Sequence, residues 1–257
     1  MKITRFSRYR RRHSPCAPRE RAGGEKEELM RRRLRALLAM GVLVALIALV
    51  LSACGSGGSA QEEAKARPLP LHPTEKALSP GEYHSVKFKP PLSFKVGKGW
   101  SNTAAQLSDK FELGQQGETG FLTFANVKEV HKPASTYEVV DAPKDLVGWL
   151  QQHPYLKTSK PQPVTLGGVK GEQLDVLVKD LPQDYNPLCG PDCVDIAPLS
   201  NGQTAAIFRE GNERKVFVLE DVKGDTVMIW YAGPPDTFDK FASKARKVVD
   251  SVRWEGS

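Results

Sequence analysis

One short stretch of the sequence decides in which cellular compartment this chain can fold. Residues 36–51 contain no charged and no polar side chain, and Arg31, Arg32, Arg33 and Arg35 come directly before them. A helix that spans a membrane needs about 20 apolar residues, whereas the core of a secretory signal needs about 7 to 15. The run is therefore short for a permanent span, and the residues that follow it become decisive.

The apolar run ends in Leu51-Ser52-Ala53-Cys54. Small residues before a cysteine resemble the lipobox of bacterial lipoproteins, in which the cysteine thiol takes a diacylglyceryl group and becomes the first mature residue. The resemblance implies lipidation at Cys54, recognition of Leu51, Ser52 and Ala53 by the signal peptidase, and a position at the extracytoplasmic face of the cell membrane. Several acyl chains hold a protein on a bilayer more firmly than one does. A plain membrane span with an incidental cysteine is the alternative.

The composition divides the chain into four parts. Residues 1–29 are a basic extension, and translation could instead begin at Met30. Residues 30–53 are the expected signal peptide, residues 54–82 a lipidated cysteine with a flexible Gly/Ser/Pro tether, and residues 83–257 a globular domain. Residues 1–54 carry a net charge of +9 and residues 55–257 a net charge of −2. The basic character therefore belongs to the export end, and it predicts no nucleic-acid binding by the mature protein.

The domain sequence predicts a single α+β unit. Alternating apolar residues indicate strands at 84–89, 92–96, 110–113, 120–130, 163–178 with a Gly-Gly turn, 204–208, 215–219 and 226–231. Helices are expected at 141–153 and 235–249, a terminal strand at 251–254, and an irregular loop at 181–203. Many hairpins with two helices predict an antiparallel sheet flanked by helices.

Three segments carry a resemblance to a known fold. They are Phe94 to Trp100, the Gly167 to Gly171 hairpin, and the final helix that runs into Asp250 to Trp254. Their order resembles the PsbP-like (oxygen-evolving-enhancer) αβα sandwich, over most of residues 84–254. The resemblance implies a non-enzymatic binding or assembly module, and it supplies no active-site residue.

No catalytic, cofactor or metal motif is present in the sequence, so none of these sites is predicted. The pair Cys189 and Cys193 predicts a structural disulfide, because two nearby thiols outside the membrane are oxidised and a separation of four can satisfy disulfide geometry. Tyr185, Asn186, Asp192 and Asp195 flank this pair and make the loop the candidate binding surface. The four tryptophans could line a pocket, but their apolar surroundings favour core packing.

The sequence therefore predicts a lipid-anchored envelope protein that binds an unknown envelope protein or small ligand and is not an enzyme. Two alternatives stay open. One is a carrier of a small apolar or lipid ligand, and the other is an envelope hydrolase.

Overall fold

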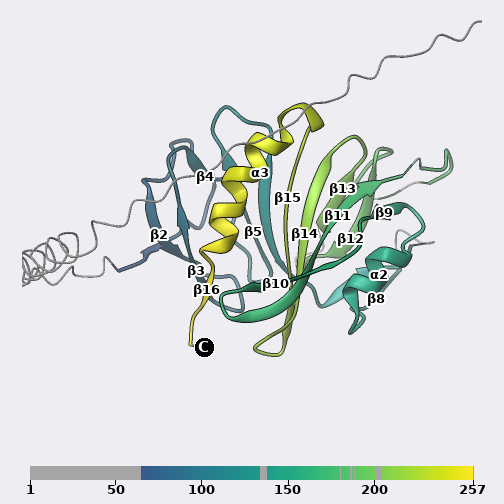
Figure 1. Ribbon diagram of the computed structural model, residues 1–257, viewed down its shortest axis with the longest axis horizontal. Coiled ribbons are helices and arrows are strands. Elements are labelled where there is room, and N and C mark those ends of the chain that lie inside the picture. Colours follow the sequence, from purple (N-terminus) through teal and green to yellow (C-terminus); the bar gives the residue numbers. More distant parts are fainter. Residues whose placement is uncertain are drawn as a thin grey trace, which may run out of the picture. The chain divides into compact units, whose positions relative to one another are not determined.

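An eight-stranded sheet forms the centre of the folded unit (Figure 1). The computed structural model describes residues 65–133, 138–179, 181–185, 187, 189–200 and 204–256, all within the compact unit Gln61–Ser257. The sheet has the order β10-β11-β14-β15-β6-β5-β4, and β9 pairs with β11 beside this path. Its strands are β4 (Trp100–Asn102), β5 (Lys110–Gln115), β6 (Phe121–Asn126), β9 (Leu156–Thr158), β10 (Gln162–Leu166), β11 (Val169–Val178), β14 (Glu213–Val222) and β15 (Asp225–Gly233).

Smaller sheets complete the unit. One has the order β1-β2-β3-β16, made of β1 (Arg67–Pro68), β2 (Gly81–His84), β3 (Leu92–Val96) and β16 (Arg253–Trp254). Two further pairs are β7 (Glu129–His131) with β8 (Val139–Asp141), and β12 (Cys193–Pro198) with β13 (Thr204–Arg209). Among the described strands, β1 and β2 are parallel and the other pairs are antiparallel.

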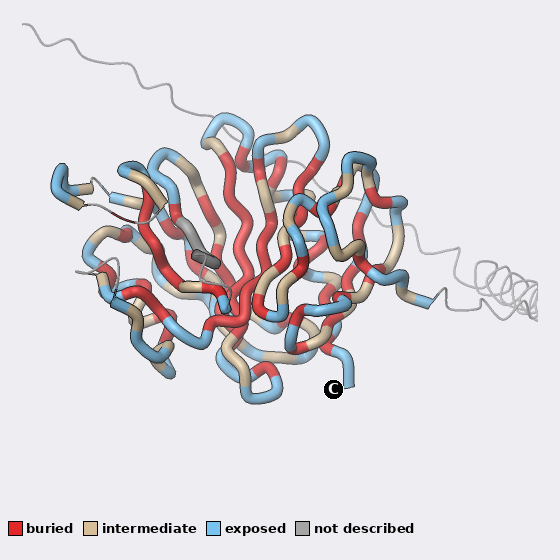
Figure 2. The backbone as a smooth tube through the Cα atoms, turned by 180° about the vertical axis from the view of Figure 1, so that it is seen from behind, coloured by how far each residue is buried: buried red, intermediate tan, exposed pale blue. Residues whose placement is uncertain are grey.

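Successive residues of the central strands face two separate cores. On β14, Phe217 belongs to one core, and Val216 and Val218 belong to the other. The first core lies under helix α3 (Pro235–Asp250) and the β1-β2-β3-β16 sheet, and the second lies under helix α2 (Leu146–Gln152) and the β12–β13 pair. Figure 2 shows the buried positions concentrated along the central strands. A sheet with a helix on each face confirms the predicted α+β class.

The final helix follows its sequence pattern closely. It begins after Pro234 with Pro235 in the first turn, where a missing N–H costs nothing. Phe238, Phe241 and Ala245 are among its buried residues. The predicted bounds, 235–249, differ from the observed ones by one residue. The terminal strand β16 then pairs with β3, so the expected docking beside an earlier strand is confirmed.

The domain begins earlier than the sequence indicated. Part of the expected tether is folded, because β1 and β2 lie within residues 67–84 and Leu69 is buried. The side-chain amide of Gln106 donates to the carbonyl oxygen of Leu69, and that of Asn102 donates to the carbonyl oxygen of Pro70. Residues 67–82 are therefore part of the globular domain and not of a flexible spacer.

Four predicted elements differ from the structure. The single strand expected at 120–130 is two strands, β6 and β7, which belong to different sheets. The strand expected at 84–89 is a loop after His84, the last residue of β2, because the N–H groups of Val86 and Lys87 bond to the side chain of Gln106 and not to another strand. The helix expected at 141–153 begins only at Leu146, since Asp145 caps its first turn. The loop expected to be irregular over 181–203 contains strand β12.

Candidate functional site

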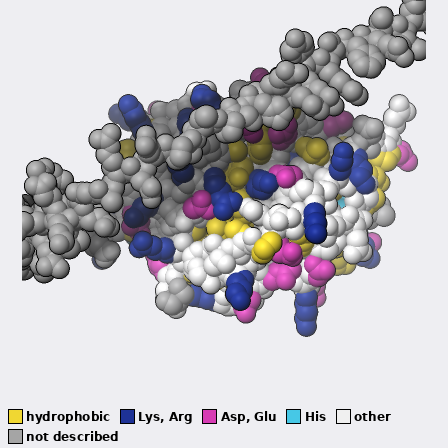
Figure 3. All heavy atoms as spheres, in the orientation of Figure 1, with side chains coloured by type: hydrophobic (Ala, Val, Ile, Leu, Met, Phe, Trp, Pro, Cys, Tyr) yellow, Lys and Arg dark blue, Asp and Glu magenta, His cyan; other side chains and the backbone are white. Residues whose placement is uncertain are grey.

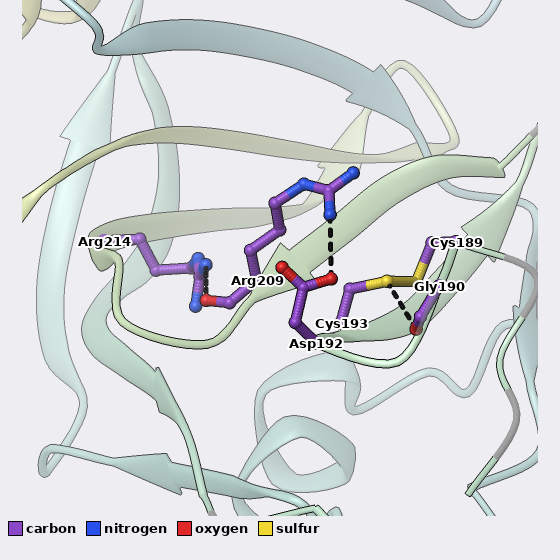
Figure 4. Close-up of a disulfide and its surroundings, with 6 residues drawn as sticks. All are labelled: Cys189, Gly190, Asp192, Cys193, Arg209 and Arg214. Carbon is purple, nitrogen blue, oxygen red and sulfur yellow. Dashed lines mark hydrogen bonds and ion pairs between the residues drawn. A yellow bond between two sulfur atoms is a disulfide. The ribbon is translucent and has the colours of Figure 1, made fainter.

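The disulfide loop, residues 181–192, leads from β11 into β12 and is held at several points. Cys189 and Cys193 form a disulfide with their Cα atoms 6.1 Å apart, as their spacing predicted. The Sγ atom of Cys193 also lies 3.1 Å from the carbonyl oxygen of Gly190 (Figure 4). Because a disulfide sulfur carries no proton, this is a packing contact. The bridge fixes the end of the loop to the start of β12.

Asp192 ties the same loop to the neighbouring strand. Its carboxylate accepts from the Arg209 guanidinium at 3.1 Å, and its carbonyl oxygen accepts from the N–H of Glu210 at 2.7 Å. Both side chains of the ion pair are about half exposed, so the pair contributes little to stability and mainly sets position. The carboxylate and the carbonyl oxygen of Asp192 thus both have partners within the domain.

Asp195 does not lie on the exposed loop that the sequence indicated. It is inside strand β12, opposite Ile207, and only 2% of its surface is exposed. The strand begins at Cys193 itself, inside the stretch that the sequence indicated as irregular. Asn186 lies outside the described residues.

Tyr185 joins the disulfide loop to the body of the domain. Its ring is half-buried and lies 4.5 Å, centroid to centroid, from the ring of Tyr155. Burial raises the pKa of the Tyr185 hydroxyl to about 12, and the negative charge of Asp195 adds to the increase. The hydroxyl therefore stays protonated throughout the physiological pH range.

Tyr185 belongs to a line of contacting rings that we call the aromatic row, made of Trp149, His153, Tyr155 and Tyr185. The centroids of Trp149 and His153 are 5.1 Å apart, and those of His153 and Tyr155 are 5.9 Å apart. Trp149 comes from α2, His153 caps the end of that helix, and Tyr155 precedes β9. Trp149, Tyr155 and Tyr185 are half-buried, so the row presents ring surface to solvent while it packs on the second core.

His153 is the buried member of the row. Its Nδ1 atom accepts a hydrogen bond from the N–H of Tyr155 at 3.3 Å, and 2% of the residue is exposed. Burial, assisted by the positive charge of Lys179, lowers the pKa of His153 to about 4. The imidazole is therefore neutral near pH 7 and acts as a packing and capping group.

The sequence identified Tyr185 but not the rest of the row. Trp149 and His153 are separated by four residues, which places them on one side of a helix, and this spacing was the available signal. Trp100, Trp230 and Trp254 are buried core residues, as their patterns predicted, and Trp149 alone among the four tryptophans is half-exposed.

Arg214 supports this region from inside the domain. It is 2% exposed, and its guanidinium donates to the carbonyl oxygens of Arg209 at 2.9 Å and Val176 at 3.4 Å. The guanidinium also lies 4.5 Å from the centroid of the Phe208 ring. Burial lowers the pKa of Arg214 to about 10, so the side chain remains charged at neutral pH. The residue thus links β11, β13 and β14, and Figure 4 shows its bond to the carbonyl oxygen of Arg209.

Within the described residues, no group of three or more His, Cys, Asp or Glu side chains could hold a metal ion. None of the helices built from these residues has the length and apolar character needed to cross a bilayer. The lipobox residues Leu51, Ser52, Ala53 and Cys54 lie outside the described residues.

No protein-family model and no curated protein matches the chain. Two solved structures are similar to it at 11% sequence identity. One is cyanobacterial PsbP (CyanoP) from Synechocystis sp. PCC 6803, with a TM-score of 0.37, covering 72% of this chain and 99% of that one. The other is LpqN of Mycobacterium tuberculosis, described as involved in cell envelope biogenesis, with a TM-score of 0.28, covering 70% of this chain and 88% of that one. The α+β class rests on the strands and helices themselves and not on these two similarities.

Proposed function

We propose that this protein is a lipid-anchored cell-envelope protein that acts as a non-enzymatic binding or assembly module. The anchor is the acylated Cys54, and the binding surface is the aromatic row together with the disulfide loop. The observation that carries the proposal is the contact of Tyr185 with Tyr155, which holds the disulfide loop against the half-buried rings of the aromatic row.

Aromatic side chains that are partly exposed and firmly held suit recognition. Tyr and Trp offer large contact areas and lose little conformational entropy when they bind, which is why they are enriched in binding interfaces. The disulfide, the Asp192–Arg209 pair and the Tyr185 contact reduce the freedom of the loop before any partner arrives. Such preorganisation lowers the entropic cost of association.

The titration of His153 supports a non-enzymatic role for the row. A general base works best when its pKa is near the operating pH. The pKa of His153 is about 4, and its Nδ1 atom is already used by the Tyr155 N–H. The one histidine in the row is thus poorly suited to proton transfer at neutral pH.

The proposal is tested by partner recovery from detergent-solubilised envelope with the intact lipidated protein as bait. Wild type is compared with Trp149→Ala and Tyr185→Ala, and Val86→Ala is the control, because Val86 is 44% exposed and lies outside the row. We expect a molecule whose recovery falls at least tenfold with both row variants and is unchanged with the control. Recovery of the same molecules in equal amounts by all four proteins would contradict the assignment of the surface.

A further inference from the structure

Charge is distributed unevenly along the sequence of the domain. Residues 65–102 contain seven Lys or Arg against two Asp or Glu, a net charge of +5, whereas residues 103–257 have a net charge of −5. The basic segment forms β1, β2, β3, β4 and the turns between them. We call this part of the surface the basic end, and it includes the exposed side chains of Arg67, Lys76, Lys87, Lys89 and Lys98.

The lysines of the basic end are largely free of internal partners. Within the part of the chain that the structure describes, Lys95 pairs with Glu82 at 3.9 Å, but Lys76, Lys87, Lys89 and Lys98 make no ion pair. Their charge is available to an anionic surface. On the face shown in Figure 3, dark-blue side chains lie at both ends and are mixed with magenta ones over the middle.

The chain enters the domain at the basic end, so the proposed anchor on Cys54 would be joined to the domain there. Because residues 67–82 are folded, twelve residues separate Cys54 from Arg67, and these span about 45 Å at full extension. A lipid on Cys54 would therefore hold β1 within about 45 Å of the headgroups.

The aromatic row lies at the other end of the domain. In Figure 1, β2, β3 and β4 stand at one end of the long axis, and α2 and β9 stand at the opposite end. The sheet order agrees, since five strand spacings separate β4 from β11, the partner of β9. At about 4.8 Å per spacing, this separation is about 24 Å.

We infer that the basic end lies against the anionic phospholipid headgroups of the bilayer that holds the anchor, and that the aromatic row points away from that bilayer. The inference rests on the proposed lipid anchor and deepens the proposed function. The partner of the row then approaches from the aqueous space and is not a lipid of the anchoring membrane. Each lysine near an anionic surface increases surface affinity about fivefold.

Lysine footprinting of the full lipidated protein tests this arrangement. The protein is placed in vesicles of phosphatidylcholine alone or of phosphatidylcholine with phosphatidylglycerol, and acetylation rates are read by mass spectrometry. We expect Lys76, Lys87, Lys89 and Lys98 to react at least threefold more slowly in the anionic vesicles, and salt at 0.5 M to remove the difference. The exposed Lys144, Lys157 and Lys160, near α2 and β9, are the internal controls and should keep their rates.

Two triple lysine variants provide a second test. In Lys87→Gln/Lys89→Gln/Lys98→Gln we expect the protection of Lys76 to disappear, and in the matched Lys144→Gln/Lys157→Gln/Lys160→Gln control we expect it to persist. Equal rates at both ends in both vesicle types, or protection of Lys144, Lys157 and Lys160 instead, would overturn the inference. Flotation with phosphatidylcholine vesicles reports the lipid anchor separately. Loss of flotation would contradict the proposed lipid anchor. The lysine acetylation rates in anionic vesicles would still show whether the basic end contacts the headgroups.

Discussion

The rings of Tyr155 and Tyr185, thirty residues apart in the chain, lie with their centroids 4.5 Å apart and their planes inclined at 54°. Tyr155 sits between α2 and β9, and Tyr185 sits on the disulfide loop. This contact places the disulfide loop, which follows β11, beside the other rings of the aromatic row. The loop and the row together form one surface. The proposed binding surface depends on it.

Removing the contact should loosen the loop and leave the domain folded. We expect Tyr185→Ala to increase amide hydrogen exchange over residues 181–185 by at least tenfold, because loss of packing lowers the local opening free energy. Exchange in β14 and β15 should not change. Unchanged exchange over residues 181–185 would show that the ring does not hold the loop.

The disulfide should contribute modestly to global stability. Closing a loop between residues four apart stabilises the fold by about 2 kcal/mol in the chain-entropy model. We therefore expect Cys189→Ser/Cys193→Ser to lose about that amount in urea unfolding and to stay folded at 25 °C. A variant that is unfolded at this temperature would show that the bridge supports the whole domain and not one loop.

The pH dependence of stability should reveal the buried His153. The pKa of histidine in an unfolded chain is near 6.5, whereas burial and Lys179 lower the folded value to about 4. Between these pH values the unfolded chain binds more protons, so this residue makes the fold less stable as the pH falls from 6.5 to 4.

Replacing His153 should therefore flatten this dependence. We expect the loss in unfolding free energy between pH 7 and pH 4.5 to be about 2 kcal/mol smaller in His153→Phe than in wild type. The matched variant His153→Gln also removes the titrating ring but does not preserve its packing. Agreement between the two variants isolates the titration, and a loss as large as that of wild type in both would contradict the burial of a neutral imidazole.

Gly171 marks a close approach of two strands. A Cβ atom there would lie 2.2 Å from the backbone carbonyl oxygen of Val218, and backbone cannot easily move away. We expect Gly171→Ala to lower the free energy of unfolding by about 2–3 kcal/mol. The control is Gly97→Ala, where no heavy atom lies within 4 Å of the added carbon, and it should stay within about 0.5 kcal/mol of wild type. Equal stabilities of the two variants would show that β11 and β14 lie farther apart at Gly171 than this distance indicates.

The sequence predicted most of the fold because its patterns were local. The Gly167-Gly168 turn, the stripe on α3 and the terminal strand all follow from spacing that neighbouring residues impose, and each is present. The earlier start of the domain could not be read in this way. It depends on Asn102 and Gln106, which bind the backbone of a proline-rich segment more than thirty residues away.

The candidate site was predicted only in part for the same reason. The disulfide and Tyr185 lie in one short segment, so their proximity could be predicted from the sequence. Trp149, His153 and Tyr155 join them through tertiary packing of α2 against the sheet, and no local pattern reports that contact. Asp195 was assigned to the loop because its strand pairs with β13, a partner defined only by the fold.

The lipid anchor at Cys54 is the central claim, and intact-mass and N-terminal peptide analysis of the protein purified from membranes tests it most directly. The account predicts a chain that begins at Cys54, with diacylglyceryl on its sulfur, and a Cys54→Ser variant that keeps residues 30–53 and carries no lipid. An unmodified Cys54 still joined to residues 30–53 in the wild-type protein would contradict it.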